Sequence, residues 1–418
     1  MKKYSLPVGK PRDLKVKDLY PVDSPNLTKV NKKWKNDKCE ELKSKLKKIS
    51  EKTDKFKADK QNTYIIEVGN VYQKLIYSTM RKMEVEFSVH NGYNIHALQF
   101  WEILKVYVDP IVTKIKNRKG HGCYNTMFAL LDSVDEQAIL CFNHFISSYE
   151  LEWDWNASAT SYRSDFRGKH ITQYIRGADG DGNIDSVSNI KSFRLRLGQN
   201  RLSLYVAPLK HDLTFNVMFG SVLAAFSTLK GGGRTKGTVK NDILQEGILK
   251  GGTMILPFSI FSQNNDNQSI LNRLNLLYLI CMHFEDVHIV YPMVIDDRSN
   301  YGMTYLVAVG YKDVHVAILN YLMDWYDTRL ENPKVNLNLG VIDDHIESTC
   351  MIYEKIIERQ KTHIVRDSKL LKEYINSDLE KITMDMKPIY TKHAQKWLEK
   401  YPVEEINEID VMIHKKLE

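Results

Sequence analysis

Short apolar runs alternate with helical stretches between about residues 126 and 312, and this alternation constrains the fold more than any other feature of the chain. The runs with strand composition are 202–207, 253–256, 287–291 and 304–309, and the helical stretches between them include 217–229 and 269–284. Such alternation is typical of a parallel sheet covered by helices, whose strands are buried on both faces and read as continuous apolar runs. The pattern predicts an α/β fold with a mostly parallel sheet.

The two ends of the chain differ from this middle part. Four prolines within residues 1–30 predict an extended arm. Apolar spacing of three to four predicts helices within 64–80 and 94–117, and helices over much of the last hundred residues. We therefore divide the chain into a basic Lys-rich arm (1–60), a helical N-terminal extension (61–120), an α/β domain (121–312, with an insertion at about 230–248) and a helical C-terminal extension (313–418).

Positive charge is concentrated in the N-terminal arm. Residues 1–60 hold 19 Lys and Arg against 9 Asp and Glu, a net charge of +10, whereas the whole chain carries +7 and its remainder is therefore near −3. Lysines of such an arm can contact phosphate, and the candidates for RNA or partner contact are Lys32, Lys33, Lys35, Arg234 and Lys236. A solvated Lys-rich segment explains the same composition, and the body is not basic enough to bind RNA over its whole surface.

Several classes of protein and site do not fit the sequence. No apolar run approaches the ~20 residues of a membrane-spanning helix, and the first five residues are not followed by the apolar segment of a secretory signal. The five cysteines form no C-x-x-C pair, which favours a reducing compartment without disulfides or zinc. The acidic turn at 179–185 lacks the glycine and glutamate of a calcium loop, because Ile184 and Ile190 hold those positions. We expect no metal and no membrane span.

Several motifs occur in the order found in one family of enzymes. Residues 151–162 contain W-x-W-x-A-S, residues 179–191 contain an Asp/Gly turn followed by N-I-K, residues 249–256 read L-K-G-G-T-M-I-L, and residues 302–307 end in T-Y-L-V. In this order they resemble the Adrift-type, FtsJ-like cap-specific RNA 2′-O-methyltransferases, and most of all the members from large cytoplasmic DNA viruses. The resemblance covers roughly residues 81–400. It implies a Rossmann-like methyltransferase core with helical N- and C-terminal extensions.

The resemblance also implies where catalytic residues would lie. The family uses a Lys-Asp-Lys-Glu set to remove the proton of a ribose hydroxyl. Position by position, these residues fall on Gln99, Pro208, Pro257 and Met303 of this chain. Proline has no side-chain proton acceptor, so the set is not intact.

The family's glycine-rich cofactor turn is replaced as well. It falls on residues 132–138, including Ser133, Asp135, Glu136 and Gln137, where no glycine is present. Glycine lets a ligand approach the backbone closely. The two acidic residues would also repel the carboxylate of S-adenosylmethionine, so we expect that no cofactor is bound.

Two tryptophans, Trp153 and Trp155, stand two residues apart in the first of these motifs. Exposed tryptophans can stack on bases or on a cap. In the resembling family this segment runs through a strand beside the cofactor site, so we favour packing in the core.

The resemblance and the lost positions together predict a catalytically inactive pseudo-methyltransferase that acts as a structural or scaffold protein, such as a component of a viral particle. A protein partner or homo-oligomer is expected, in the host cytoplasm or in the virion. One alternative is a non-catalytic RNA-binding subunit of a capping or transcription complex, which would use the N-terminal arm. Another is an active S-adenosylmethionine-dependent methyltransferase with relocated catalytic residues, the candidates being Lys210, His211, Asp212 and Lys250.

Overall fold

The computed structural model describes a subset of the 418 residues. The described residues are 1–6, 41, 44, 95–116, 124–131, 136–159, 170–198, 202–209, 213–231, 251–260, 267–293, 304–333, 335, 337, 345, 347–358 and 379–404. The following description concerns these residues.

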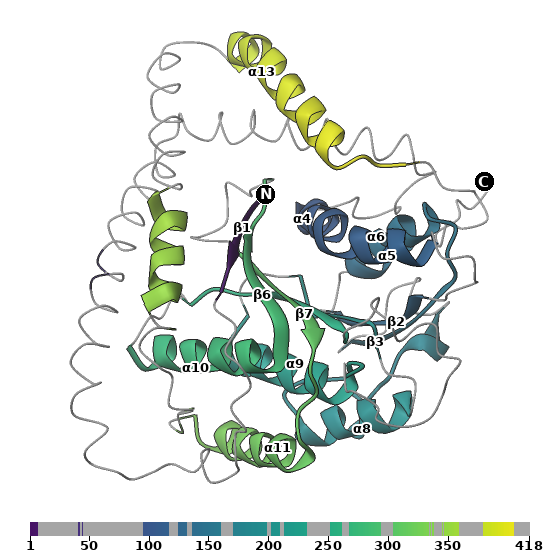
Figure 1. Ribbon diagram of the computed structural model, residues 1–418, viewed down its shortest axis with the longest axis vertical. Helices are drawn as coiled ribbons and strands as arrows, with labels where there is room; N and C mark the ends of the chain where they lie inside the picture. The colour runs from purple at the N-terminus through teal and green to yellow at the C-terminus, as the bar shows by residue number, and fades with distance from the viewer. Residues whose placement is uncertain are drawn as a thin grey trace.

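A seven-stranded mixed sheet forms the centre of the molecule, with the strand order β1-β6-β7-β5-β4-β2-β3 (Figure 1). The strands are β1 (Lys2–Ser5), β2 (Tyr124–Leu131), β3 (Trp153–Ala159), β4 (Leu204–Val206), β5 (Thr253–Pro257), β6 (Phe284–Tyr291) and β7 (Tyr305–Tyr311). Strands β3, β2, β4 and β5 pair in parallel, whereas β7 is antiparallel to both of its neighbours, β5 and β6. Strand β1 is antiparallel to β6 and forms one edge.

The α/β class is confirmed, but the sheet is mixed. Three of the six strand pairings in the described part of the chain are antiparallel. The continuous apolar runs misled the sequence analysis because they report burial on both faces and not strand direction: β7 is almost entirely buried although it runs antiparallel. Residues 2–5 of the predicted arm are part of the sheet, which the sequence analysis did not foresee.

Helices cover both faces of the sheet and form two separate cores (Figure 1). On one face lie α4 (Ile95–Ile103), the π-helical turn η1 (Leu104–Val108), α5 (Asp109–Lys116) and α6 (Gln137–Ser147), together with the end of α13 (Leu379–Lys400). On the other lie α8 (Val187–Leu197), α9 (Phe215–Thr228), α10 (Asn267–His283), α11 (Val316–Glu331) and the helical residues 347–358. The predicted helices near 94–117, 217–229 and 269–284 are therefore present.

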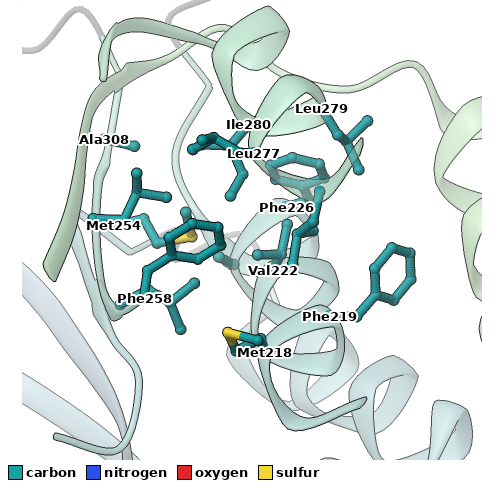
Figure 2. Close-up of a cluster of buried hydrophobic side chains, with 14 of the residues drawn as sticks. Met218, Phe219, Val222, Phe226, Met254, Phe258, Leu277, Leu279, Ile280 and Ala308 are labelled. Atoms are coloured by element: carbon teal, nitrogen blue, oxygen red, sulfur yellow. The ribbon is translucent and has the colours of Figure 1, made fainter. Parts of the chain in front are cut away.

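Side chains of the central strands alternate between these cores. Ile255 and Val307 pack on the α4 side, whereas Met254 and Ala308 pack on the α9 side, as expected for the two-residue period of a strand. Figure 2 shows the second core, where α9 brings Phe226 and its neighbours against α10 and β5.

Side-chain caps fix the starts of the helices that follow β3 and β4. The hydroxyl of Ser186 accepts from the backbone N–H of Asn189 at α8, and that of Thr214 accepts from Val217 at α9. Capping satisfies backbone donors that the first helical turn leaves free. Among the described helices, none is long and apolar enough to cross a membrane.

Candidate functional site at the carboxyl ends of the strands

The order of the parallel strands defines a place where ligands bind in open α/β sheets. Strand β2 has β3 on one side and β4 on the other, so the chain leaves β2 in one direction and later returns to its opposite edge. In such sheets a ligand lies outside the carboxyl ends of the strands at this reversal point. The candidate site is therefore the rim where β2, β4 and β5 end.

Two of the predicted catalytic positions lie at this rim. Pro257 is the last residue of β5, and Pro208 follows β4, whose Val206 pairs with Ile255. Since both prolines come two residues after a paired position on adjacent parallel strands, they lie at neighbouring strand ends. Pro257 is buried and Pro208 is half-buried.

A third predicted position joins them from helix α4. Gln99 is fully buried, and its Oε1 accepts a hydrogen bond from the Tyr305 hydroxyl at 2.9 Å. Tyr305 is in turn the register partner of Pro257 in the β5–β7 pair. Gln99 and Pro257 are thus linked through Tyr305 on the α4 side of the sheet, and Pro208 lies at the end of the strand next to that of Pro257. The fourth, Met303, lies outside the described residues.

This cluster is poorly suited to proton transfer. It consists of an amide, a phenol and two prolines, and the phenol of Tyr305 uses its proton to bond Gln99. An amide neither gives nor takes a proton near neutral pH. Neighbouring strand residues on this face, including Val206 and Ile255, are apolar and fully buried. The arrangement resembles a packed core more than an open active site.

One turn further along α4, the buried carboxylate of Glu102 connects three distant parts of the chain. Its Oε1 accepts from Trp397 Nε1 at 3.0 Å, and its Oε2 accepts from the backbone N–H of Met293 at 2.8 Å. The amino group of Met1 lies 3.6 Å from Oε2. Sequence reasoning did not single out Glu102, although a carboxylate inside an otherwise apolar helical segment was a usable signal.

The π-helical turn η1 carries Lys105 into a group of aromatic rings. Its ammonium lies 5.4 Å from the ring centre of Trp101, 5.5 Å from that of Phe145 and 5.4 Å from that of Tyr149. Burial lowers the pKa of Lys105, and the negative charges of Glu404 and Asp109 oppose that shift. Cation–π contacts of this kind stabilise a partly desolvated lysine, so Lys105 helps to fix α4 against α6.

A buried arginine supports the rim from the opposite face. Arg273 of α10 donates from Nη1 to the carbonyl of Ser259 at 2.6 Å and from Nη2 to that of Leu213 at 3.4 Å. These carbonyls belong to the segments that follow β5 and β4. Burial lowers the pKa of Arg273 to about 10. The sequence analysis missed it, although it is the one arginine in the apolar stretch 269–284.

Of the predicted cofactor turn, the structure describes little. Glu136 precedes α6 and is half-buried, and its carbonyl accepts from the backbone N–H of Ile139 and Leu140. The backbone of Gln137 begins α6, while its side chain, like Ser133 and Asp135, lies outside the described residues. Loss of cofactor binding therefore stays a prediction.

The acidic turn at 179–185 is stabilised by its own hydrogen bonds. The amide of Asn189, fully buried, donates to Asp181 Oδ1 and to the carbonyl of Asn183, both at 2.9 Å, and accepts from the N–H of Asp179. Gly177 has φ +76°, and a Cβ there would lie 2.3 Å from Asn189 Oδ1. The described residues contain no group of three or more His, Cys, Asp or Glu placed to hold a metal ion.

Both tryptophans of the first motif pack in the α4-side core, as expected. Trp155 is 4% exposed. Trp153 lies edge-on to Phe142 at 5.1 Å and donates to Asn143 Oδ1 at 3.1 Å. They are thus engaged in packing and not presented for base stacking.

The remaining candidates lie outside the described residues. These are the proposed contacts Lys32, Lys33, Lys35, Arg234 and Lys236, and the alternative catalytic residues Lys210, His211, Asp212 and Lys250. The structure does not bear on them.

Comparison with known proteins adds no relative: no protein-family model matches the chain, and no curated protein matches it.

Proposed function

We propose that this chain has a Rossmann-like methyltransferase core of the cap 2′-O-methyltransferase type whose catalytic positions have been replaced, and that it acts as a non-catalytic structural or scaffold protein. The proposal joins the sequence resemblance to the geometry of the strand ends. It implies a protein partner or a second copy of the chain as the ligand.

The sheet supports the first half of this proposal. Strand β6 is antiparallel to β7, which is antiparallel to β5, so β6 runs in the same direction as β5. Five strands, β3, β2, β4, β5 and β6, thus share one direction, with helices on both faces and a reversal point at β2. This is the arrangement of nucleotide- and cofactor-binding α/β folds, with β7 inserted in the opposite direction.

The observation that carries the proposal is the meeting of Gln99, Pro208 and Pro257. The family alignment placed them in one catalytic set, although 158 residues separate the first from the last. Gln99 bonds Tyr305, Pro257 is the register partner of Tyr305, and Pro208 follows the strand next to that of Pro257. A wrong alignment would have scattered these positions, so their proximity favours the family assignment. An amide and two prolines cannot replace the charged side chains that methyl transfer uses in that family, so these residues favour a non-catalytic protein.

The buried hydrogen bond from Tyr305 to Gln99 supports a structural role for these positions in place of a catalytic one. Active-site charges are destabilising for a fold, because a buried lysine or carboxylate loses its hydration. An amide bonded to a phenol is satisfied without charge. Replacing the charged set in this way would stabilise a fold that is kept for binding.

Calorimetry with S-adenosylmethionine tests the proposal on the full chain, with an active 2′-O-methyltransferase titrated in parallel as the positive control. We expect no heat of binding up to millimolar cofactor and no methyl transfer to capped RNA. Micromolar binding would show that the chain has a cofactor site despite the replaced turn, and methylated RNA would show that catalytic residues have moved elsewhere. If neither is seen, affinity purification under native salt, with size-exclusion chromatography of the eluate, would identify the partner or the oligomer.

A second candidate function, a non-catalytic RNA-binding subunit, is favoured by the surface of α8. Lys191, Arg194 and Arg196 are exposed on this helix and surround Leu195, which is 81% exposed. Cations near a helix C-terminus also complement the helix dipole, so their presence alone does not require RNA. RNA binding that weakens steeply with salt, and weakens further in an Arg194→Gln/Arg196→Gln variant, would favour this function over the scaffold.

A further inference from the structure

Strand β1 is a short edge strand that pairs on one side only, and the Met1 amino group before it bonds the Tyr401 hydroxyl at 3.0 Å. It pairs with β6 through four residues, from Lys2 opposite Tyr291 to Ser5 opposite His288 (Figure 1). Beyond the strand, Leu6 is buried and its N–H donates to the carbonyl of Val287 at 3.0 Å. A short strand that pairs on one side only opens at a lower free energy than the sheet to which it is attached.

A buried histidine lies next to this strand, opposite Ser5 in the neighbouring strand β6. His288 of β6 is 6% exposed, and its ring lies 5.3 Å from the ring of Tyr107 in η1. Its Nδ1 has no hydrogen-bond partner among the described residues, and neither has the Tyr107 hydroxyl. A neutral imidazole fits this setting, whereas an imidazolium would need acceptors that the seam between β1, β6 and η1 does not supply.

The charges that face His288 increase this preference. The ammonium of Lys3 in β1 lies 5.3 Å from the centre of the same Tyr107 ring. Asp286 on β6 is exposed and is the acidic group acting in the opposite sense. Burial, followed by the charge of Lys3, lowers the pKa of His288 to about 4, and Asp286 offsets part of this effect.

We propose that β1 is an acid-released strand: protonation of His288 undocks residues 1–6 and exposes the edge of β6, while the rest of the sheet stays folded. The release follows because a second cation would be buried beside Lys3 when β1 is docked, whereas an undocked β1 lets water reach the imidazolium. The uncovered β6 edge then presents free backbone donors and acceptors to which another strand can add. The inference does not depend on the proposed function.

The expected size of the effect follows from linkage. If His288 titrates at about 4 when β1 is docked and at ~6.5 when it is released, lowering the pH from 7.4 to 5.0 favours release by roughly 25-fold. The sign is fixed by the lowered pKa: docking is at full strength above pH ~6.5 and weakens as the pH falls toward 4.

Hydrogen exchange of the full chain at pH 7.4 and 5.0, corrected for intrinsic exchange rates and read by mass spectrometry, tests the proposal. We expect the amides of residues 2–6, and those of 288–291 that bond β1, to lose roughly 25-fold protection at pH 5.0, while the amides of α9 stay better protected than those of β1 at both pH values. In His288→Phe, whose ring packs on Tyr107 but takes no proton, this loss should disappear. The matched control, His315→Asn, removes an exposed histidine at the start of α11 and should behave as the parent.

Three results would overturn the proposal: unchanged protection of β1 at pH 5.0, an equal loss in His288→Phe, or equal protection of β1 and α9 at pH 5.0. Equal protection would mean that β1 opens only when the whole molecule unfolds. If His288→Phe does not fold, Lys3→Gln on the exposed strand serves in its place. Without that cation the docked imidazole is protonated more easily, so the acid-dependent loss should shrink, and a loss of the original size would count against the mechanism.

Discussion

Helix α9 and helix α4 lie on opposite faces of the sheet, and they satisfy their buried polar groups in different ways. In α9, Ser227 donates to the carbonyl of Leu223 and Thr228 to that of Ala224, each at 2.7 Å and within the helix itself. In α4, Gln99 is bonded to Tyr305 and Glu102 to Trp397, across 206 and 295 residues of sequence. These buried hydroxyls of α9 therefore bond within their own helix, whereas the buried polar side chains of α4 bond to distant segments.

This difference between the two helices bears on function because the long-range bonds of α4 lie at the candidate site. The α4 side joins the strand ends, the segment after β6 and the end of α13 at two buried polar side chains. An enzyme of the resembling family would keep charged, accessible groups there. In this chain the same place is a structural junction.

The largest loss of stability should come from a substitution in the apolar core on the α9 side. Phe226, in the core of Figure 2, is 1% exposed. Its ring stacks on that of Tyr311, with ring centres 5.5 Å apart. We expect Phe226→Ala to lower the free energy of unfolding by about 3–5 kcal/mol through the cavity it leaves. Urea denaturation followed by circular dichroism measures this. Phe226→Leu should cost clearly less, and equal losses would argue against cavity formation as the cause.

Next in size is the removal of the carboxylate that joins the α4 side. Glu102→Ala leaves Trp397 Nε1 and the N–H of Met293 without this acceptor, which we expect to cost about 2–4 kcal/mol. The end of α13 should detach first and become sensitive to limited proteolysis. Glu102→Gln keeps one acceptor oxygen and is the matched control. If the alanine variant keeps the proteolysis pattern of the parent, Glu102 does not hold α13.

Acid should lower the free energy of unfolding through His283, a buried histidine on the α9 side. Burial lowers the pKa of His283 to about 4, so the unfolded chain, with a pKa of ~6.5, takes up the proton first. Stability from this group is complete above pH ~6.5 and is lost as the pH falls toward 4, about 2 kcal/mol of it by pH 5. In His283→Phe, the difference in unfolding free energy between pH 7.5 and 5 should shrink by that amount. An unchanged difference would show that His283 is not a source of the acid sensitivity.

Loss of the buried phenol at the candidate site should have a smaller effect. Tyr305→Phe removes the donor to Gln99 Oε1 and leaves that buried oxygen without it, at a cost of about 1–2 kcal/mol. The double variant Tyr305→Phe/Gln99→Leu, which removes both polar partners, should recover part of the loss. Chemical denaturation of the four proteins in a double-mutant cycle gives the coupling energy, and a value near zero would contradict the bond.

The smallest change in stability is expected from removing a buried hydroxyl of α9. Ser227→Ala removes a hydroxyl whose bond lies within its own helix, so we expect a change below about 1 kcal/mol. Thermal unfolding is sufficient to detect it. A loss as large as that of Tyr305→Phe would remove the distinction between local and long-range polar groups on which the comparison rests.

Much of the fold was predictable, because helices and buried strands leave periodic apolar patterns. Helices α9 and α10 were found in this way, as were the runs that became β5, β6 and β7, whereas α8 was not. The direction of β7 was not predictable, since a strand buried on both faces reads alike in either direction. Strand β1 was missed because four residues that include two lysines carry too little pattern.

At the candidate site, the resemblance placed Gln99, Pro208 and Pro257 in one set. The structure has the two prolines at neighbouring strand ends and Gln99 bonded to Tyr305, the register partner of Pro257. The hydrogen bonds that join distant segments at this site could not be predicted from the sequence. Nothing in the sequence around Glu102 indicates that its partner is Trp397, since pairing over such a separation is decided by tertiary packing. The same holds for Arg273, whose carbonyl partners have no side-chain signature.

The pairing of Lys2 with Tyr291 has a consequence for synthesis of the protein. A ribosome adding roughly 5–20 residues per second needs on the order of 15–60 s to pass from the first of these residues to the second. During that time the nascent chain carries an extended segment whose neighbour in the sheet has not been made. Strand β1 can pair only after β6 has been synthesised. A ribosome that stalls before β6 would therefore leave this segment available to chaperones or to other nascent chains.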